Sequence, residues 1–271
     1  MDKIIDVWMQ HPTRRHLADE MFASLRRWTA KTPWPSVITP EMTIATMDQG
    51  GVAVGLFAAW CGPHGWMISH EEVAAISKAY AERIVGVASA NLAKPMEAVR
   101  ELRHAIKELG FRALRMVPWL WNLPPNDRRY YPLYAECIEL GIPFCTQVGH
   151  TGPMRPSETG RPIPYLDEVA LDFPELVIIA GHIGYPWTHE MIALATKYEN
   201  VYIDTSAYTV KRYPLELVQY MKSHGRKKVM FGTNYPMITA AKALYGLDGL
   251  GLDEETKALF LGGNAARVLG I

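Results

Sequence analysis

The chain has 271 residues, of which 49% are hydrophobic, so it can bury one large core and hardly two independent ones. Lys plus Arg and Asp plus Glu both number 28, and this balance excludes a summed electric field that would attract nucleic acid or an anionic membrane surface. We therefore expect one continuous domain over residues 1–271, with a small molecule as its main partner.

Residues 1–8 form a short apolar stretch after one lysine, without the longer apolar core and the cleavage site of a signal peptide. No run along the chain approaches the roughly 20 apolar residues of a membrane-spanning helix. Cys61, Cys137 and Cys145 have neither a paired nor a metal-ligand spacing, which is typical of reduced thiols. These features predict a cytoplasmic protein with no membrane partner.

Short β-branched apolar runs alternate along the chain with longer segments of helical periodicity, which is the pattern of parallel β-α-β units. Eight strands are predicted, at Ile4–Trp8, Val52–Ala59, Ile84–Ala90, Ala113–Pro118, Pro143–Gly149, Leu176–His182, Val201–Ser206 and Val229–Pro236. Helices are predicted at Glu71–Glu82, Met96–Leu109, Tyr131–Leu140, Tyr165–Phe173, Glu190–Tyr198 and Leu215–His224.

Eight strands with intervening helices favour the α/β fold of a closed (β/α)8 TIM barrel. The competing fold is a doubly wound open sheet, which would normally carry a Gly-rich phosphate turn after its first strand. This chain has Met9-Gln10-His11-Pro12 there instead. The barrel is therefore the predicted fold.

The first crossover, at about residues 10–50, is long and rich in tryptophan and proline, including Trp28, Pro33, Trp34 and Pro35. Loops of this length are usually functional or interfacial. Two alternatives stay open, namely an insertion at the mouth of the barrel and a contact with a second subunit. The apolar stretch Trp28–Pro40 predicts a homodimer.

In a barrel of parallel strands the chemistry lies where the strands end, so polar side chains at those ends are the first candidates. The predicted strand ends carry a coherent set, formed by Asp6, Trp8, Gln10, Arg115, Gln147, His150, His182, Asp204, Ser206 and Asn234.

Several of these ends lie in segments that resemble the amidohydrolase-related family, whose members include aminocarboxymuconate semialdehyde decarboxylase. The segments are residues 176–190 around Ala-Gly-His-Ile-Gly, residues 200–206 with Val-Tyr-Ile-Asp-Thr-Ser, and residues 229–236 with Phe-Gly-Thr-Asn-Tyr-Pro. The tail at residues 263–267, Gly-Asn-Ala-Ala-Arg, and the entry to strand four at residues 110–115 are similar as well. The resemblance covers nearly the whole chain and implies a TIM barrel.

The resemblance also implies a divalent metal, held by a His-x-His pair on strand one, a His on each of strands five and six, and an Asp on strand eight. In this sequence Trp8 and Gln10 stand at the pair and Asn234 at the acid, while His150 and His182 remain. Tryptophan cannot ligate zinc, and neutral amides are poor ligands. We therefore expect no bound metal and no cofactor; the alternative is zinc or manganese held by His150, Gln10 and Asn234.

Without a metal to lower the pKa of a bound water, an easier reaction is expected, driven by histidine acid–base chemistry. His182 is predicted to be the general base or acid, with His150 as its partner or as an oxyanion donor. Asp204 either orients a histidine or caps the turn after strand seven. The predicted reaction is hydrolysis of a lactone or activated ester.

The residues predicted to bind the substrate are Trp8, Gln10, Trp60, Arg115, Trp187 and Asn234. Arg115 either receives a substrate carboxylate or fills a layer of the barrel, and the tryptophans either form an aromatic face or pack in the core. These residues indicate a small ring-bearing or unsaturated carboxylic acid. Two further functions stay open, namely decarboxylation of a similar acid and non-catalytic binding of a small ligand.

Overall fold

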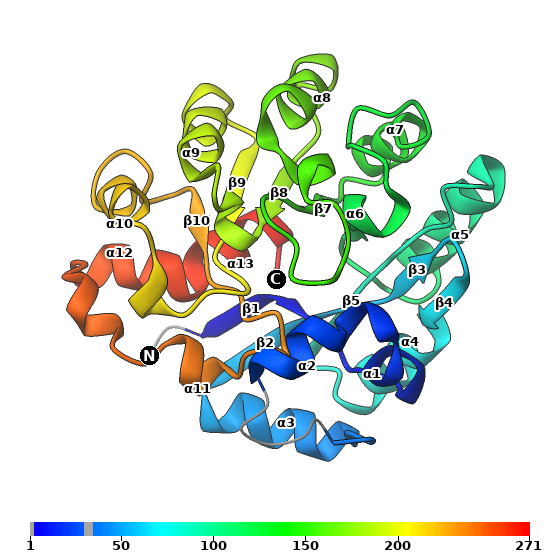
Figure 1. Ribbon diagram of the computed structural model, residues 1–271, viewed down its shortest axis with the longest axis horizontal. Helices are drawn as coiled ribbons and strands as arrows, with labels where there is room; N and C mark the ends of the chain where they lie inside the picture. The colour runs from blue at the N-terminus through cyan, green and yellow to red at the C-terminus, as the bar shows by residue number, and fades with distance from the viewer. Residues whose placement is uncertain (1–2, 30–34) are drawn as a thin grey trace.

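The computed structural model describes residues 3–29 and 35–271. Within them, eight parallel strands form a barrel that is surrounded by helices (Figure 1). The barrel strands are β1 (Ile4–Met9), β2 (Val52–Ala58), β5 (Ile84–Val87), β6 (Leu114–Met116), β7 (Phe144–Gln147), β8 (Ile178–Gly181), β9 (Val201–Asp204) and β10 (Val229–Met230). Each lies within one of the eight strands predicted from the sequence or differs from it by a residue.

The strands close into a ring through parallel pairing. Ladders join β1, β2 and β5 on one side and β6 through β10 on the other. Ala88 bridges to Leu114 and Met9 bridges to Tyr235, so the two sheets meet at both edges. A backbone hydrogen bond reinforces each junction. At the first, Arg115 N donates to the Ala88 carbonyl (2.8 Å); at the second, Gln10 N donates to the Tyr235 carbonyl (3.3 Å). The predicted (β/α)8 barrel is confirmed.

The helices predicted between the strands cover the outside of the barrel (Figure 1). They are α4 (His70–Ala79), α5 (Pro95–Lys107), α7 (Tyr131–Glu139), α8 (Asp167–Asp172), α9 (Thr188–Lys197) and α10 (Leu215–Met221), joined by α3 (Pro40–Gln49), α12 (Glu254–Ala258) and α13 (Asn264–Leu269). Their first turns follow local signals; for example, α4 begins at a capping box formed by Ser69 and Glu72. No helix in the described part of the chain is long and apolar enough to cross a membrane.

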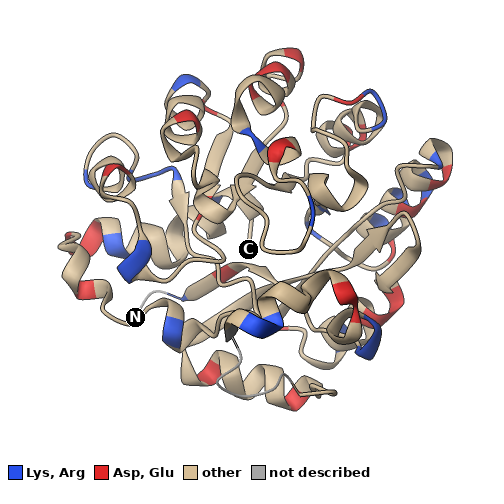
Figure 2. Ribbon diagram, viewed as in Figure 1, with Lys and Arg blue, Asp and Glu red and all other residues tan. Residues whose placement is uncertain are grey.

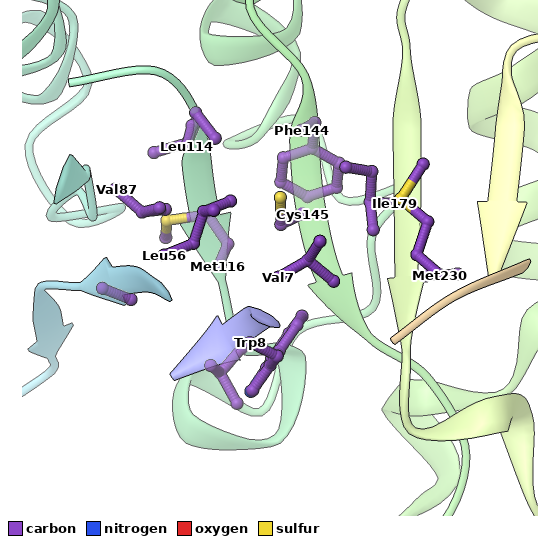
Figure 3. Close-up of a cluster of buried hydrophobic side chains, with 14 of the residues drawn as sticks. Val7, Trp8, Leu56, Val87, Leu114, Met116, Phe144, Cys145, Ile179 and Met230 are labelled. Carbon is purple, nitrogen blue, oxygen red and sulfur yellow. The ribbon is translucent and has the colours of Figure 1, made fainter. Parts of the chain in front are cut away.

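Apolar side chains fill the space inside the barrel and between the strands and helices. Figure 3 shows this cluster, to which several strands contribute, among them Val7, Leu56, Cys145, Ile179 and Met230. Trp8 belongs to the same cluster and is 1% exposed. Strands buried on both faces need apolar residues in succession rather than in alternation, which explains the continuous apolar runs in the sequence.

Several short elements that the sequence analysis did not predict surround the side of the barrel where the strands end. They are α1 (Arg14–Ala18), α2 (Ala23–Thr29), the hairpin of β3 (Trp60–Gly62) and β4 (Gly65–Ile68), α6 (Pro118–Trp121) and α11 (Ala240–Ala243). Within the first crossover, the Ser24 hydroxyl donates to the Gly152 carbonyl (2.6 Å), and Met154 N donates to the Met21 carbonyl (3.3 Å). The described part of the crossover therefore contacts the loop that follows β7, and both predicted roles of the crossover stay predictions. Pro33 and Trp34 lie outside the described residues.

Candidate functional site

A cavity of about 1250 Å³ opens where the barrel strands end. Of the residues predicted to form the site, the described cavity wall contains Trp8, Gln10, Trp60, His150, His182 and Asn234. They come from the ends of β1, β7, β8 and β10 and from the β3–β4 hairpin. Six of the nine residues predicted to be catalytic or to bind the substrate therefore line one cavity, and so does Gln147 at the end of β7.

Trp8 forms the floor of this cavity. The guanidinium carbon of Arg115 lies 4.0 Å from the centroid of the indole, and the His182 ring meets the indole edge-on with 5.1 Å between centroids. Two glycines make room for it, because a Cβ on Gly181 would lie 2.6 Å from Trp8 Cζ3 and one on Gly232 would lie 3.2 Å from Trp8 Cβ. A large ring therefore fills the centre of the barrel mouth.

Arg115 lies beneath this floor, and its side chain is not part of the cavity wall. It is 1% exposed and donates to the backbone carbonyls of Met9 (3.0 Å) and Val7 (3.2 Å) and to Gln10 Oε1 (3.3 Å). Burial lowers the pKa of Arg115 to about 10, so the guanidinium still carries its charge at neutral pH. This position argues against the predicted contact with a substrate carboxylate and agrees with the alternative, a cation that fills a barrel layer.

The Arg115 guanidinium also orients two amides at the mouth. Because a guanidinium has donors only, Gln10 turns Oε1 toward it and keeps Nε2 as its own donor. Gln10 Nε2 donates to Asn234 Oδ1 (3.3 Å) and to the Tyr235 carbonyl. Asn234 has a left-handed φ of 65° and makes no described hydrogen bond through Nδ2. Its Nδ2 group is thus left as a donor in the cavity wall.

His182 directly follows β8 and is 7% exposed, with a left-handed φ of 74°. Its Nδ1 lies 2.6 Å from the Ser206 hydroxyl oxygen, which leaves Nε2 as the ring nitrogen available to a ligand. Burial, together with the nearby charges of Arg115 and His150, lowers the pKa of His182 to about 3. The imidazole is therefore neutral at physiological pH.

His150 lies nearer the solvent, after the end of β7. Its backbone N donates to the Tyr185 carbonyl (2.5 Å), and its own carbonyl accepts from Gln147 Nε2 (3.2 Å). Gln147 is fixed in turn by Trp119, whose indole N–H donates to Gln147 Oε1. The His150 ring stacks against Trp28 of α2, with 6.4 Å between centroids and 18° between planes. The two predicted catalytic histidines thus share one cavity at different depths.

Asp204 is fully buried and is not among the described residues that line the cavity. Its Oδ1 accepts from the backbone N of Ser206 (2.6 Å), which caps the turn after β9, and no hydrogen bond joins it directly to His182 in the described structure. Burial raises the pKa of Asp204 to about 6. Of its two predicted roles, the geometry matches the turn cap; any effect on His182 passes through Ser206.

Trp187 is also absent from the described cavity wall. It is half-buried, and the guanidinium of Arg161 lies 5.9 Å from its ring centroid. Trp187 comes five residues after His182, beyond the turn that follows β8. This position does not support the predicted contact with substrate.

Other residues in the cavity wall were missed in the sequence analysis. The main ones are His16, Phe22, Trp28, Tyr185, Tyr208, Arg212 and Lys242. Tyr208, Arg212 and Lys242 follow β9 and β10 by several residues, so extending the strand-end rule into the loops would have found them. His16 and Phe22 lie in the first crossover, where no sequence pattern marks them.

The described wall of the cavity carries positive but no acidic side chains. Arg212 and Lys242 line it and are exposed, and neither forms an ion pair within the described residues. Figure 2 shows most other charged residues on the surrounding helices. Although the net charge of the chain is zero, the cavity favours an anionic ligand.

The donor set at the mouth does not fit the divalent metal implied by the family resemblance. The strand-one positions hold Trp8 and Gln10, and the strand-eight position holds Asn234. No group of three His, Cys, Asp or Glu side chains gathers among residues 3–29 and 35–271 in a way that could hold a metal ion. An indole and two amides lack the negative charge that zinc or manganese sites provide.

A family model described as amidohydrolase matches residues 49–271. An uncharacterised TIM-barrel protein from Bordetella bronchiseptica is 27% identical, with a TM-score of 0.85 over 99% of this chain and 98% of that one. A dihydroxybenzoic acid decarboxylase from Polaromonas, with bound manganese and 2-nitroresorcinol, is 18% identical, with a TM-score of 0.71 over 100% and 97%. A probable 2-pyrone-4,6-dicarboxylic acid hydrolase from Acinetobacter baumannii is 16% identical, with a TM-score of 0.68 over 99% and 100%. The last two similarities show the fold alone.

Proposed function

The chain belongs to the amidohydrolase family, and from this premise we propose that it hydrolyses a lactone or activated ester of a small ring-bearing or unsaturated carboxylic acid without a metal ion. One observation carries the proposal. His150 and His182, from the ends of adjacent strands, line a single cavity whose described wall also has aromatic rings and two cations. Fold alone does not decide function, so the reaction is argued from these side chains.

His182 is the proposed general base. Its neutral Nε2 takes a proton from a water molecule while the water oxygen attacks the carbonyl carbon of the ester. The carbon–oxygen bond to the leaving oxygen then breaks, and the leaving oxygen receives the proton from the imidazolium of His182. For a lactone the product is a single hydroxy acid. His150, nearer the solvent, exchanges protons with bulk water.

Asn234 is the proposed donor to the oxyanion that forms on the carbonyl oxygen. Its Nδ2 is held in place because Oδ1 is occupied by Gln10. A donor that is oriented before the reaction stabilises developing charge without reorganisation. Arg212 and Lys242 are the proposed partners of the substrate carboxylate, and Trp8 and Trp60 of its ring.

Decarboxylation of a similar acid is the second candidate, because the fold resembles that of a dihydroxybenzoic acid decarboxylase. That reaction requires a proton donor for the ring carbon. His182, whose pKa burial lowers to about 3, is a weak choice for this role because it is neutral at working pH. The same low pKa also makes His182 a weak base, so the pKa does not separate the two reactions, and the assay described next does.

The test is turnover of a panel of lactones and aryl esters that carry a carboxylate, with carbon dioxide release from hydroxybenzoates measured in parallel. His182→Gln is expected to lower kcat for hydrolysis by about 100-fold or more. His189→Gln is the control, because His189 is 82% exposed and lies outside the described cavity wall. Carbon dioxide release without ester hydrolysis would identify a decarboxylase. Tight binding without turnover of either class would identify a binding protein.

A further inference from the structure

Helix α1 carries a histidine into the cavity wall. Thr13 caps this helix, since its hydroxyl oxygen accepts from His16 N (3.2 Å) and its hydroxyl group donates to the Met67 carbonyl of β4 (2.6 Å). The helix is thereby anchored to the β3–β4 hairpin. His16 lines the cavity, with a relative exposure of 0%.

The side-chain nitrogen atoms of His16 and of the neighbouring Trp60 have no hydrogen-bond partner in the described structure. Both ring nitrogens of His16 are buried without a hydrogen bond in the described structure, and so is the indole nitrogen of Trp60. The rings are neighbours, with 5.0 Å between the centroids of His16 and Trp60, and 4.8 Å between those of His16 and Phe22. Buried polar groups in folded proteins are nearly always paired, so three unpaired nitrogen atoms on two neighbouring rings of the cavity wall indicate a ligand.

The chemistry of these atoms defines the ligand group. A neutral imidazole offers one donor and one acceptor, and an indole offers one donor. Burial lowers the pKa of His16 to about 3, so the ring stays neutral. No acidic or cationic side chain takes part in the contacts described for His16. A hydroxyl group, which both donates and accepts, matches this set without burying a charge.

We infer that His16 and Trp60 form a recognition subsite for an uncharged hydroxyl group on the ring of the ligand. The inference rests on the proposed function and narrows its substrate class to a hydroxylated ring acid. Trp119 on α6, whose ring centroid is 6.1 Å from that of Trp60, extends the aromatic wall around this corner. Lys242 is on α11, across the barrel from α6 (Figure 1). Lys242 thus comes from a different element of the mouth than His16 on α1 and Trp60 on β3.

The test uses phenol and toluene, two rings of similar size that differ in the hydroxyl group, titrated calorimetrically into the full chain. His16→Phe keeps a ring and removes both nitrogens. It is expected to weaken phenol binding about five- to tenfold, as for one net hydrogen bond, and to leave toluene binding unchanged. Trp60→Phe is expected to weaken phenol binding less, because it removes one donor. Trp66→Phe on the partner strand β4, outside the described cavity wall, is the matched control.

Thermal unfolding provides a second readout that needs no ligand. His16→Phe is expected to raise Tm, because it removes two buried nitrogens that have no partner. A lower Tm with an unchanged ratio of phenol to toluene affinity would overturn the inference and assign His16 a structural role. So would a wild-type chain that binds no phenol up to its solubility limit. Neither assay requires turnover, so ester hydrolysis can fail while phenol selectivity persists, and the two proposals are tested separately.

Discussion

Single side chains beneath the cavity floor determine which groups reach the ligand. Arg115 never enters the described wall, yet its hydrogen bond fixes Gln10, and Gln10 fixes Asn234. Likewise Ser206 holds Nδ1 of His182 and leaves Nε2 for the cavity. Residues that touch no substrate thus control the donors and acceptors at the site.

Asn234→Asp tests the proposed oxyanion donor at nearly constant shape. A carboxylate cannot donate where Nδ2 does, so kcat for ester hydrolysis is expected to fall by about 100-fold, as for other lost oxyanion donors. The same change supplies the acid that the family resemblance implies at this position. Steady-state kinetics with and without added manganese measure both effects. A rate that rises above wild type with manganese would contradict the proposed role of the amide.

Asp6→Asn tests the pH dependence of stability. Asp6 accepts from Trp8 N (3.1 Å), Thr233 N (3.0 Å) and the Thr233 hydroxyl (2.6 Å), and burial raises its pKa to about 7. The folded state therefore binds this proton more tightly than the unfolded chain. The stabilisation is complete below about pH 4 and is lost as the pH rises through about 7. Relative to the variant, the wild-type free energy of unfolding should fall by on the order of 2–4 kcal/mol between about pH 5 and 8.

Chemical unfolding at several pH values measures this difference. Asp248→Asn is the control, because the Asp248 side chain is 88% exposed and pairs with Lys257 at the surface. A wild-type curve that stays parallel to the Asp6→Asn curve over the whole range would show that Asp6 is not perturbed.

At the scale of elements, strand ends and their glycines shape the floor of the site. Gly181→Ala would place a methyl group against the indole of Trp8, so a loss of about 1–3 kcal/mol of stability is expected from overpacking. Adding Trp8→Leu should recover part of this loss, because it removes the contact with the indole and leaves the one with Asp204 Oδ2 (2.8 Å). Gly249→Ala is the control, since nothing lies within 4 Å of the added Cβ. Thermal unfolding of the single and double variants measures the coupling; additive losses would contradict the packing described.

The strands and the larger helices were predictable because their apolar periodicity is local. The site was predictable where a residue ends a strand, as for Gln10, His150, His182 and Asn234. Apolar periodicity shows which face of a strand a residue lies on, but not how far the residue lies from the mouth of the barrel. The sequence therefore could not show whether Arg115 lies in the cavity or beneath Trp8. His16 joins the site through α1, a helix of five residues held by Thr13, and so short a helix leaves no recognisable pattern.

At the scale of the molecule, the crossover after β1 contacts the loop after β7 through Ser24 and Trp28. The homodimer predicted for the stretch Trp28–Pro40 remains a prediction. Trp28 is 63% exposed although it stacks on His150, so it has apolar surface left to bury. Sedimentation equilibrium of the wild type and of Trp28→Ser should show a dimer that the substitution weakens. A monomer at all concentrations would contradict the prediction.

The acid–base chemistry proposed for His150 and His182 requires no resident metal ion. Elemental analysis tests this requirement most directly, on wild-type protein purified without chelator and again after incubation with zinc or manganese, with ester hydrolysis followed on the same samples. We expect far less than one metal ion per chain in both samples, and equal rates. A near-stoichiometric metal content, with a hydrolysis rate that rises in proportion to that content, would contradict the proposal. It would indicate a metal-dependent mechanism with the ion held by His150, Gln10 and Asn234.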